Sequence, residues 1–394
     1  MKSYSQRVAY SQAVQRSGFS LPYGRLDVEL TERCNNNCLH CYINRPAGDI
    51  EAIRRELSTE EIQDILRQAA SLGFLSVRLT GGEPLLREDF EEIYLYARKQ
   101  GLKVILFTNA TLISDRLAEL FERIPPLDMI EVTVYGMSKE SYEQVTRNPG
   151  SFDAARRGID LLLAKKIPFI VKGTVLPPNK GELDDFEAWA SGIPWMEKQP
   201  GYALFLDLRC RRDSEKKNRM IKKMRLSPEE GVKILERSEN YLKKMQEFCS
   251  KFMGPPGDAL FTCGAGVGGG TVDACGVLLP CMMLRHPDCV YDLHDGSLKD
   301  ALDNFFPALR SMKSQNPDYL SRCARCFLKG LCEQCPGKSW IEHGSLDTPV
   351  EYLCLAAHAQ AGNLGLIREG ERAWEVEDWE ARIHGFSERK VPPE

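Results

Sequence analysis

Between residues 26 and 208, short apolar segments alternate with longer amphipathic segments, and this alternation limits the folds open to the chain. The apolar segments are predicted strands, because short runs rich in β-branched and large apolar residues favour extended backbone. The segments between them have helical spacing; residues 58–72 begin with Ser58 as N-cap and carry Glu60 and Glu61 in the first turn. Strands that alternate with helices predict a parallel sheet.

Six strands are predicted, over residues 26–30, 74–79, 103–107, 129–134, 168–175 and 203–208. A closed barrel of this kind needs eight strands, so the expected fold class is α/β with an open, partial (β/α)6 barrel. Reactive residues of parallel sheets lie at the C-terminal ends of the strands. Cys34, Gly81 and Asn109 each follow a strand and are therefore expected on one rim.

Composition places the protein in a cellular setting. The 394 residues carry a net charge of −4, which gives no global basic field for nucleic acid. The N-terminus has no apolar signal core, and no apolar stretch is long enough to span a bilayer. Fourteen cysteines without a secretion signal favour metal sites over disulfides. We therefore expect a cytoplasmic protein that binds neither nucleic acid nor a membrane.

Cys34, Cys38 and Cys41 form a C-x3-C-x2-C motif directly after the first predicted strand. A four-iron cluster has four iron corners and prefers thiolate ligands, so three cysteines would leave one iron open to a small molecule. A structural metal site is normally closed by four ligands, which makes the open set typical of catalysis. The alternatives are a zinc loop or three unpaired core thiols, but zinc loops usually contain C-x2-C pairs.

The cysteine spacing resembles that of radical S-adenosylmethionine (SAM) enzymes. The resemblance implies that these thiolates hold a [4Fe-4S] cluster, that SAM chelates the open iron, and that reductive cleavage yields a 5'-deoxyadenosyl radical. A second motif, Gly81-Gly82-Glu83-Pro84, follows the strand predicted at 74–79. In the radical SAM family this segment holds the amino group of SAM, and Glu83 would supply the carboxylate. Alone, the segment is also consistent with a turn before a helix that has proline at its first position.

Three further residues are expected at the SAM site because of the same resemblance. Asn109 lies in Thr-Asn-Ala-Thr, which resembles a Thr-Asn-Gly-Thr segment with Ala110 in place of glycine. Thr133 would contact the SAM ribose, and Arg147 would lie near the SAM carboxylate, which suits its guanidinium fork. The alternatives are a strand threonine and a solvated arginine. Tyr135 replaces a common aspartate of the family, so that aspartate's role is not expected here.

A second group of cysteines occupies the C-terminal half of the chain. Its pattern is Cys263-x12-Gly276-x4-Cys281, then Cys323-x2-Cys326-x5-Cys332-x2-Cys335, then Cys354. This resembles the loop-rich SPASM domain that follows the barrel in many radical SAM enzymes. The resulting division is a radical SAM partial barrel at 22–225, a SPASM domain at 226–365, and a charged C-terminal tail at 366–394 with Trp374 and Trp379 on a terminal helix.

The SPASM resemblance also sorts the cysteines between two auxiliary iron–sulfur clusters, expected to be [4Fe-4S]. Cys323, Cys326, Cys332 and Cys354 would hold the distal cluster, and Cys263, Cys281 and Cys335 the nearer one. The usual fourth thiolate of the nearer cluster is missing, so its iron is either open or closed by Cys249, Cys275 or Asp258. For the four-cysteine block alone, zinc is an alternative, because C-x2-C pairs bind zinc well.

These features predict a radical SAM oxidoreductase that modifies a ribosomally made peptide by crosslinking or side-chain oxidation. A tetrapyrrole or another small precursor is the alternative substrate, and a non-catalytic iron–sulfur electron carrier is the alternative class. A carrier has no need of a SAM pocket, so the Gly-Gly-Glu-Pro segment and Asn109 favour an enzyme. Met282 follows Cys281 where sulfatase-maturing relatives often have an aspartate, which disfavours that proton-transfer chemistry.

The expected partners follow from this chemistry. Reductive cleavage needs an electron donor, such as a flavodoxin or ferredoxin reductase system. About two dozen residues precede the first strand, which is short for a separate leader-recognition domain, since domains rarely fall below about 50 residues. A peptide substrate is therefore expected to use a separate leader-binding protein or the barrel surface.

Overall fold

The computed structural model describes residues 23–389, so most of the N-terminal segment and the end of the predicted tail lie outside the described residues. The α/β prediction is confirmed, because strands and helices alternate along the first half of the chain. The six strands of this half that were predicted are β1 (Arg25–Thr31), β4 (Ser76–Gly81), β5 (Lys103–Thr108), β6 (Leu127–Val134), β7 (Phe169–Thr174) and β8 (Gly201–Ala203).

These six strands are parallel and follow one another across the sheet in sequence order. Three short strands from the C-terminal half, β9 (Thr271–Val272), β10 (Val277–Leu279) and β11 (Tyr291–Asp292), extend the same sheet beyond β1. In this extension β9 runs parallel to β1, with Asp27 paired to Thr271, while β10 is antiparallel to both its neighbours. One sheet of nine strands thus crosses the boundary predicted at residue 225.

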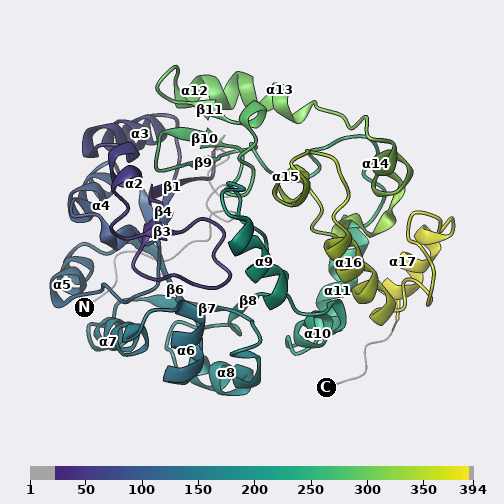
Figure 1. Cartoon of the computed structure of the whole chain (residues 1–394), viewed down its shortest axis with the longest axis horizontal. Helices are drawn as coiled ribbons and strands as arrows, with labels where there is room; N and C mark the ends of the chain where they lie inside the picture. Colours follow the sequence, from purple (N-terminus) through teal and green to yellow (C-terminus); the bar gives the residue numbers. More distant parts are fainter. Residues whose placement is uncertain (1–22, 390–394) are drawn as a thin grey trace.

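Helices cover the outer face of the parallel strands, as Figure 1 shows on the left and lower sides of the molecule. They are α2 (Ile50–Arg55), α3 (Thr59–Ser71), α4 (Phe90–Lys99), α5 (Asp115–Arg123), α6 (Lys139–Thr146), α7 (Ser151–Ala164) and α8 (Leu183–Ser191). The predicted N-cap of α3 is present, with Ser58 and Glu61 in a reciprocal capping box. The main core forms where these helices bury their apolar faces against strand residues such as Leu26, Leu79 and Val132.

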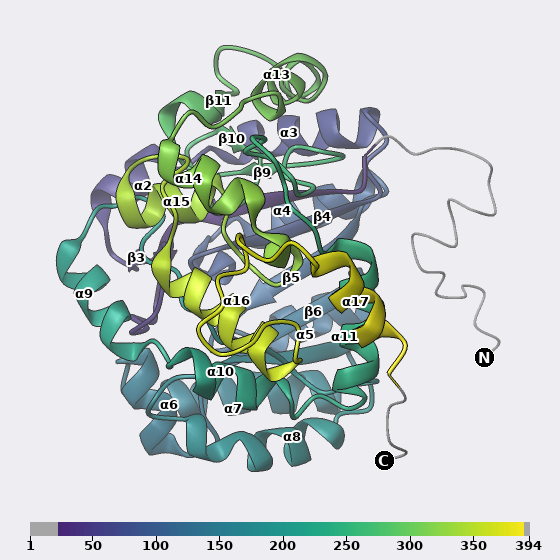
Figure 2. The ribbon, with the colours of Figure 1, turned by 90° about the vertical axis from the view of Figure 1, so that its right-hand side faces the viewer.

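The C-terminal half consists of short elements. They are α9 (Glu215–Met224), α10 (Pro228–Leu235), α11 (Tyr241–Phe252), α12 (Leu298–Asp300), η4 (Ala301–Phe305), α13 (Phe306–Arg310), α14 (Pro317–Ser321), η5 (Cys323–Arg325), η6 (Phe327–Gly330), α15 (Pro336–His343), α16 (Glu351–Asn363) and α17 (Trp379–Ser387). Figures 1 and 2 together place α11, α16 and α17 on one side of the parallel sheet. Trp379 begins α17, whereas Trp374 precedes it.

Two predicted elements end differently from expectation. The strand predicted at 203–208 is wrong except for Ala203, because β8 spans Gly201–Ala203. Leu204, Leu206 and Leu208 are buried, but they pack in two apolar clusters and not in a strand ladder. The helix predicted over 227–252 divides into α10 and α11, because Asn240 has a left-handed backbone (φ 55°) between them. Within residues 23–389, no helix is both long enough and apolar enough to cross a membrane.

Candidate active site

A cavity of about 510 Å³ opens at the C-terminal ends of the parallel strands, where the sequence places its candidate reactive residues. We call it the catalytic cavity. Seven of the predicted site residues line it: Cys34, Cys38, Cys41, Gly81, Gly82, Asn109 and Thr133. The structure therefore brings residues from the cysteine loop, β4, β5 and β6 to one space.

The cysteine loop is held by short polar contacts. Cys34 ends β2 (Arg33–Cys34), which pairs with β3 (Arg45–Pro46), and its thiol accepts a hydrogen bond from the Asn36 amide at 3.4 Å. The Asn109 side chain lies 3.8 Å from the same sulfur. Burial, and then the neighbouring Cys41 and Cys34, raise the pKa of Cys38 well above its ordinary value. Because ligands must be deprotonated, metal binding here would displace protons.

The two glycines allow the end of β4 to lie against the backbone that leads into the cysteine loop. A Cβ atom on Gly81 would lie 2.2 Å from the Thr31 carbonyl oxygen, and one on Gly82 would lie 2.1 Å from that of Arg33. The amide of Gly82 donates to Thr31 at 2.7 Å, and Gly81 has a φ of 131°. The close approach that needs glycine is thus made by the chain's own backbone at both positions.

Glu83 follows these two glycines, and none of its surface is exposed to solvent. Its carboxylate accepts hydrogen bonds from the Thr108 hydroxyl and the Asn109 amide, both at 2.8 Å, and from the Leu85 amide at 3.2 Å. Burial raises its pKa to about 7, although these three donors oppose the shift. Glu83 therefore joins the ends of β4 and β5, while neither it nor the buried Pro84 lines the cavity.

Arg147 is the one predicted SAM contact that the structure places on the exposed surface. It caps the C-terminus of α6 in a left-handed conformation, and its guanidinium lies 3.9 Å from the Met220 sulfur. Its neighbour Asn148 instead holds the cysteine loop by donating to the Asn35 carbonyl at 3.0 Å. Nothing in the sequence indicated that Asn148, and not Arg147, contacts the cysteine loop.

The sequence did not predict several lining residues, among them Lys172, Tyr135 and Asp207. Lys172 of β7 lies 3.0 Å from the Glu131 carboxylate, and its ammonium is over the Phe107 ring. Burial lowers the pKa of Lys172, although Glu131 opposes the shift. The hydroxyl of Tyr135 hydrogen-bonds the Cys38 thiol, and Asp207 follows β8. The one sequence signal for Lys172 and Tyr135 as lining residues is their position in or just after a predicted strand. Many other strand residues share that position.

The four cysteines predicted for the distal set lie together away from the catalytic cavity. Cys323, Cys326, Cys332 and Cys354 line one pocket, together with Arg322, Lys329, His358 and Trp374. Burial raises the pKa of Cys326 to about 12, and the three other thiols of the set add to this shift. The Arg322 guanidinium lies 3.9 Å from the Cys354 sulfur. The pocket is therefore lined by four thiols and two cationic side chains.

The three cysteines of the predicted nearer set are also neighbours. Burial raises the pKa of Cys281, and the adjacent Cys335 and Cys263 thiols add to the shift. Met282, the next residue, lines the catalytic cavity, so this set lies at the edge of that cavity. Across residues 23–389, no group of three or more His, Cys, Asp or Glu side chains is spaced to hold one metal ion.

The candidates for a fourth ligand of the nearer set lie in other surroundings. Cys249 is buried on α11 in the small apolar cluster around Phe327. Asp258 pairs with Lys313 at 3.1 Å. Cys275 lies 4.0 Å from the Glu32 carboxylate. The source of a fourth ligand therefore stays a prediction for all three.

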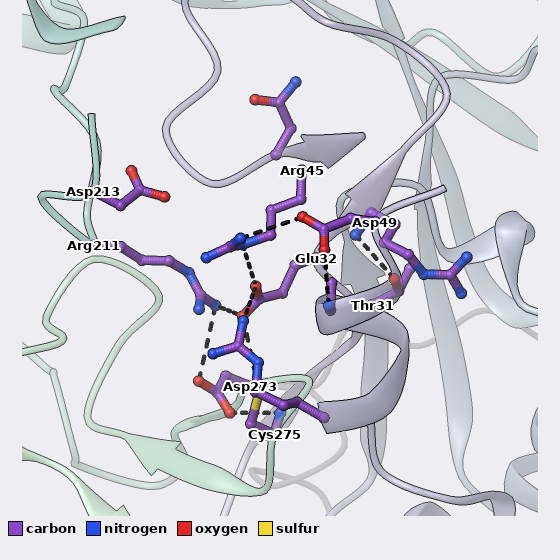
Figure 3. A network of polar contacts seen from close by, with 12 residues as sticks. Thr31, Glu32, Arg45, Asp49, Arg211, Asp213, Asp273 and Cys275 are labelled. Atoms are coloured by element: carbon purple, nitrogen blue, oxygen red, sulfur yellow. Dashed lines mark hydrogen bonds and ion pairs between the residues drawn. The ribbon is translucent and has the colours of Figure 1, made fainter. Parts of the chain in front are cut away.

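A buried ionic network connects the cysteine loop to the hairpin that carries Cys281. Figure 3 shows Glu32 between Arg45 and Arg211, with Asp273 and Cys275 of the hairpin beyond Arg211. Arg285 extends this network by pairing with Glu29 of β1 at 2.7 Å and with Asp273 at 3.2 Å. Breaking one partner of a buried pair leaves an uncompensated charge, so this network resists relative movement of the two cysteine-bearing segments.

Residues 28–190 of the chain match the family described as the Radical SAM superfamily. The match covers the cysteine loop and the ends of β4, β5, β6 and β7, whereas β8 lies beyond it. The cysteine and glycine motifs that line the catalytic cavity therefore lie within a radical SAM domain. That superfamily implies a [4Fe-4S] cluster and SAM as cofactors.

Particular proteins resemble the chain over different lengths. The AdoMet-dependent heme synthase of Methanosarcina barkeri is 35% identical over 155 residues, which is 39% of this chain and 43% of that protein. The chain thus spans under half the length of this relative. The structure of native anSMEcpe with bound AdoMet and Cp18Cys peptide has a TM-score of 0.56 and 16% identity, covering 93% of this chain and 99% of that one. Streptococcus suis SuiB bound to S-adenosylmethionine has a TM-score of 0.59 and 17% identity, covering 87% and 79%.

Proposed function

We propose that the protein cleaves SAM reductively at a cluster held by Cys34, Cys38 and Cys41 and uses the resulting radical to modify a peptide. The observation that carries this proposal is the meeting of these three thiols with Gly81, Gly82, Asn109 and Thr133 around one cavity. Three thiolates leave one corner of a four-iron cluster free. When bound, the cluster and SAM supply a 5'-deoxyadenosyl radical that abstracts hydrogen from an unactivated carbon.

The chain's own residues have separate roles in this proposal. Gly82, Asn109 and Thr133 line the wall against which SAM would lie, and Glu83 is buried behind that wall, where its carboxylate, when ionised, would favour an ammonium group. Lys172 is the cation that lines the same cavity, so we assign the SAM or substrate carboxylate to it in place of Arg147. Tyr135 orients the Cys38 sulfur through its hydroxyl.

A peptide is the substrate that we favour. The whole-chain fold resembles anSMEcpe, whose structure contains a bound peptide, and SuiB. A tetrapyrrole is the second candidate, because a relative that matches 155 residues of the chain is a heme synthase. Either substrate would occupy the catalytic cavity between β7, β8 and Met282.

The C-terminal cysteines complete the proposal. Two auxiliary iron–sulfur clusters would be held by Cys323, Cys326, Cys332 and Cys354, and by Cys263, Cys281 and Cys335. The mutual proximity of the thiols within each set supports this sorting. These clusters would accept an electron from the substrate or bind one of its atoms. A flavodoxin or ferredoxin would supply the reducing electron, and a separate protein would bind a leader peptide.

The test is replacement of Cys34, Cys38 and Cys41 together by alanine, with Cys289→Ala as the control, because Cys289 is buried outside all three sets. After anaerobic reconstitution and addition of a reductant, the wild type and the control should release 5'-deoxyadenosine, and the triple variant should release none. Iron should fall from about twelve to about eight per chain if all clusters are of the four-iron type. Equal 5'-deoxyadenosine release by the triple variant and the wild type would contradict the proposal.

A further inference from the structure

A second cavity, of about 390 Å³, lies beside the catalytic cavity. The two cavities share Tyr202, Ala203, Phe205 and Asp207, so the chain segment 202–207 forms a common wall. We call this second space the side cavity. Its other walls come from the C-terminal half, so it lies between the parallel sheet and the helices of that half.

The common wall begins with an open strand edge. β8 is the last strand of the sheet and pairs only with β7 among the described strands, in the register Gly173 to Tyr202. Gly201 and Ala203 are exposed. An edge strand presents unpaired amide and carbonyl groups that can pair with an extended peptide. In Figure 1, β8 lies at the side of the sheet nearest α9 and α10.

The side cavity is apolar where it faces the C-terminal helices. Leu235 of α10, Met245 and Phe248 of α11, and Leu331 line it. Met245 is unbranched and soft, so such a lining adapts to apolar side chains of different shape. The nearby Gln360 donates to the Tyr241 hydroxyl at 3.0 Å, which leaves the apolar part of the lining to receive a ligand.

The end of the side cavity near the catalytic cavity is charged. Lys338 of α15 pairs with Asp207 at 2.5 Å and with Glu333 at 2.9 Å. All three residues line the side cavity, and Asp207 also lines the catalytic cavity. A ligand that reaches both spaces therefore passes an apolar pocket, an open strand edge and a polar junction in turn.

We propose that a peptide substrate pairs with the edge of β8 in an extended conformation, places one apolar side chain in the side cavity and presents its reacting residue to the catalytic cavity. This inference rests on the peptide part of the proposed function. Pairing with the strand edge would provide affinity, and the apolar pocket would provide sequence preference, as in other β-strand additions. The substrate class is thus a peptide with an aliphatic or aromatic residue close to the modified position.

The experiment uses the reconstituted full chain with SAM and a pool of random synthetic nonapeptides, from which bound peptides are recovered by ultrafiltration and sequenced by mass spectrometry. Met245→Trp is designed to fill the side cavity. Leu242→Trp is the matched control, because it lies on the same helix with 42% of its surface exposed and is not among the cavity's lining residues. Phe248→Ala is designed to enlarge the side cavity, so it tests whether cavity size sets the preferred residue.

We expect the wild type to enrich peptides with Leu, Phe or Met at one position, and we expect Met245→Trp to reduce this enrichment at least tenfold. Leu242→Trp should enrich the same peptides as the wild type, and Phe248→Ala should shift the preferred residue towards Trp. Iron content and thermal unfolding of each variant check folding. No enrichment, or equal enrichment by Met245→Trp and Leu242→Trp, would overturn the inference. Release of 5'-deoxyadenosine by the same wild-type sample tests the proposed SAM chemistry separately.

Discussion

The two halves of the chain reach a fixed structure by different means. In the first half, strands such as β1 bury six of seven residues, and the helices cover the sheet with a continuous apolar core. In the second half, strands have two or three residues, and the cysteines of the distal set surround a pocket at the centre. The first half is therefore specified by packing, whereas the second half surrounds a pocket lined by four thiols, where the proposed distal cluster would be held.

This difference has a consequence for the sheet that both halves share. β9 adds to β1, and the Arg285 and Arg211 ion pairs fix the hairpin beside the cysteine loop. The hairpin thus belongs to the rigid sheet, although it carries Cys281 of the nearer set. The segments around the distal set have no such strand pairing within the described residues, and they pack instead in a separate apolar cluster that includes Phe327, Leu328 and Ala361.

The largest expected effect is a loss of local stability confined to the C-terminal half. Cys326→Ala combined with Cys332→Ala removes two thiols of the distal set, and we expect local stability in residues 323–335 and 351–363 to fall by more than about 4 kcal/mol, as losses of metal sites can do. Native-state hydrogen exchange measures this per segment. Cys34→Ala combined with Cys38→Ala is the matched control and should leave exchange in both segments unchanged. Equal loss of protection throughout the chain would contradict the contrast between the halves.

The second prediction concerns a charge within the packed half. Burial raises the pKa of Glu83 from 4.5 to about 7, so the folded state holds a proton that the unfolded state has lost between these values. The wild type should therefore lose stability as pH rises from 4.5 to 7, by about 3 kcal/mol. Glu83→Gln cannot titrate and should lack this slope, whatever constant cost it carries.

Urea unfolding of SAM-free wild type and Glu83→Gln at pH 5 and pH 8 measures the difference. Glu182→Gln is a suitable control, because hydrogen bonds from Ser141, Met137 and Ser138 lower the pKa of Glu182 despite its partial burial. That shift has the opposite sign, so the Glu182 carboxylate should gain stability as pH rises. Parallel pH profiles for wild type and Glu83→Gln would show that Glu83 is not buried as a proton-binding group.

The sequence predicted the regular half well because periodicity and capping are local properties. Ser58 and five of the six strand positions follow from neighbouring residues alone, whereas the last strand, β8, shares only Ala203 with its predicted range. The division of residues 227–252 into two helices depends on Asn240, whose side chain type permits but does not require a left-handed backbone. Lys172, Tyr135 and Asp207 could not be identified as lining residues, because their positions depend on which strands border the cavity.

The smallest expected effect concerns Ala110, which stands where the resembling motif has glycine. Ala110 is fully buried with a φ of 61°, a left-handed conformation that costs an L-residue about 1–2 kcal/mol. Ala110→Gly removes that strain, but it also removes a buried methyl group worth about 0.8 kcal/mol and adds about 0.5–1 kcal/mol of backbone entropy to the unfolded chain. These effects nearly cancel, so the free energy of unfolding should change by less than about 0.5 kcal/mol.

Ala118→Gly is the matched control, because Ala118 is equally buried within α5 and has no strain to relieve. Ala118→Gly should lower the free energy of unfolding by about 1.5–2 kcal/mol, because it loses helix propensity and a buried methyl group. Urea unfolding measures both variants. Equal costs at both positions would show that the left-handed backbone at Ala110 carries no strain and that packing alone fixes this loop.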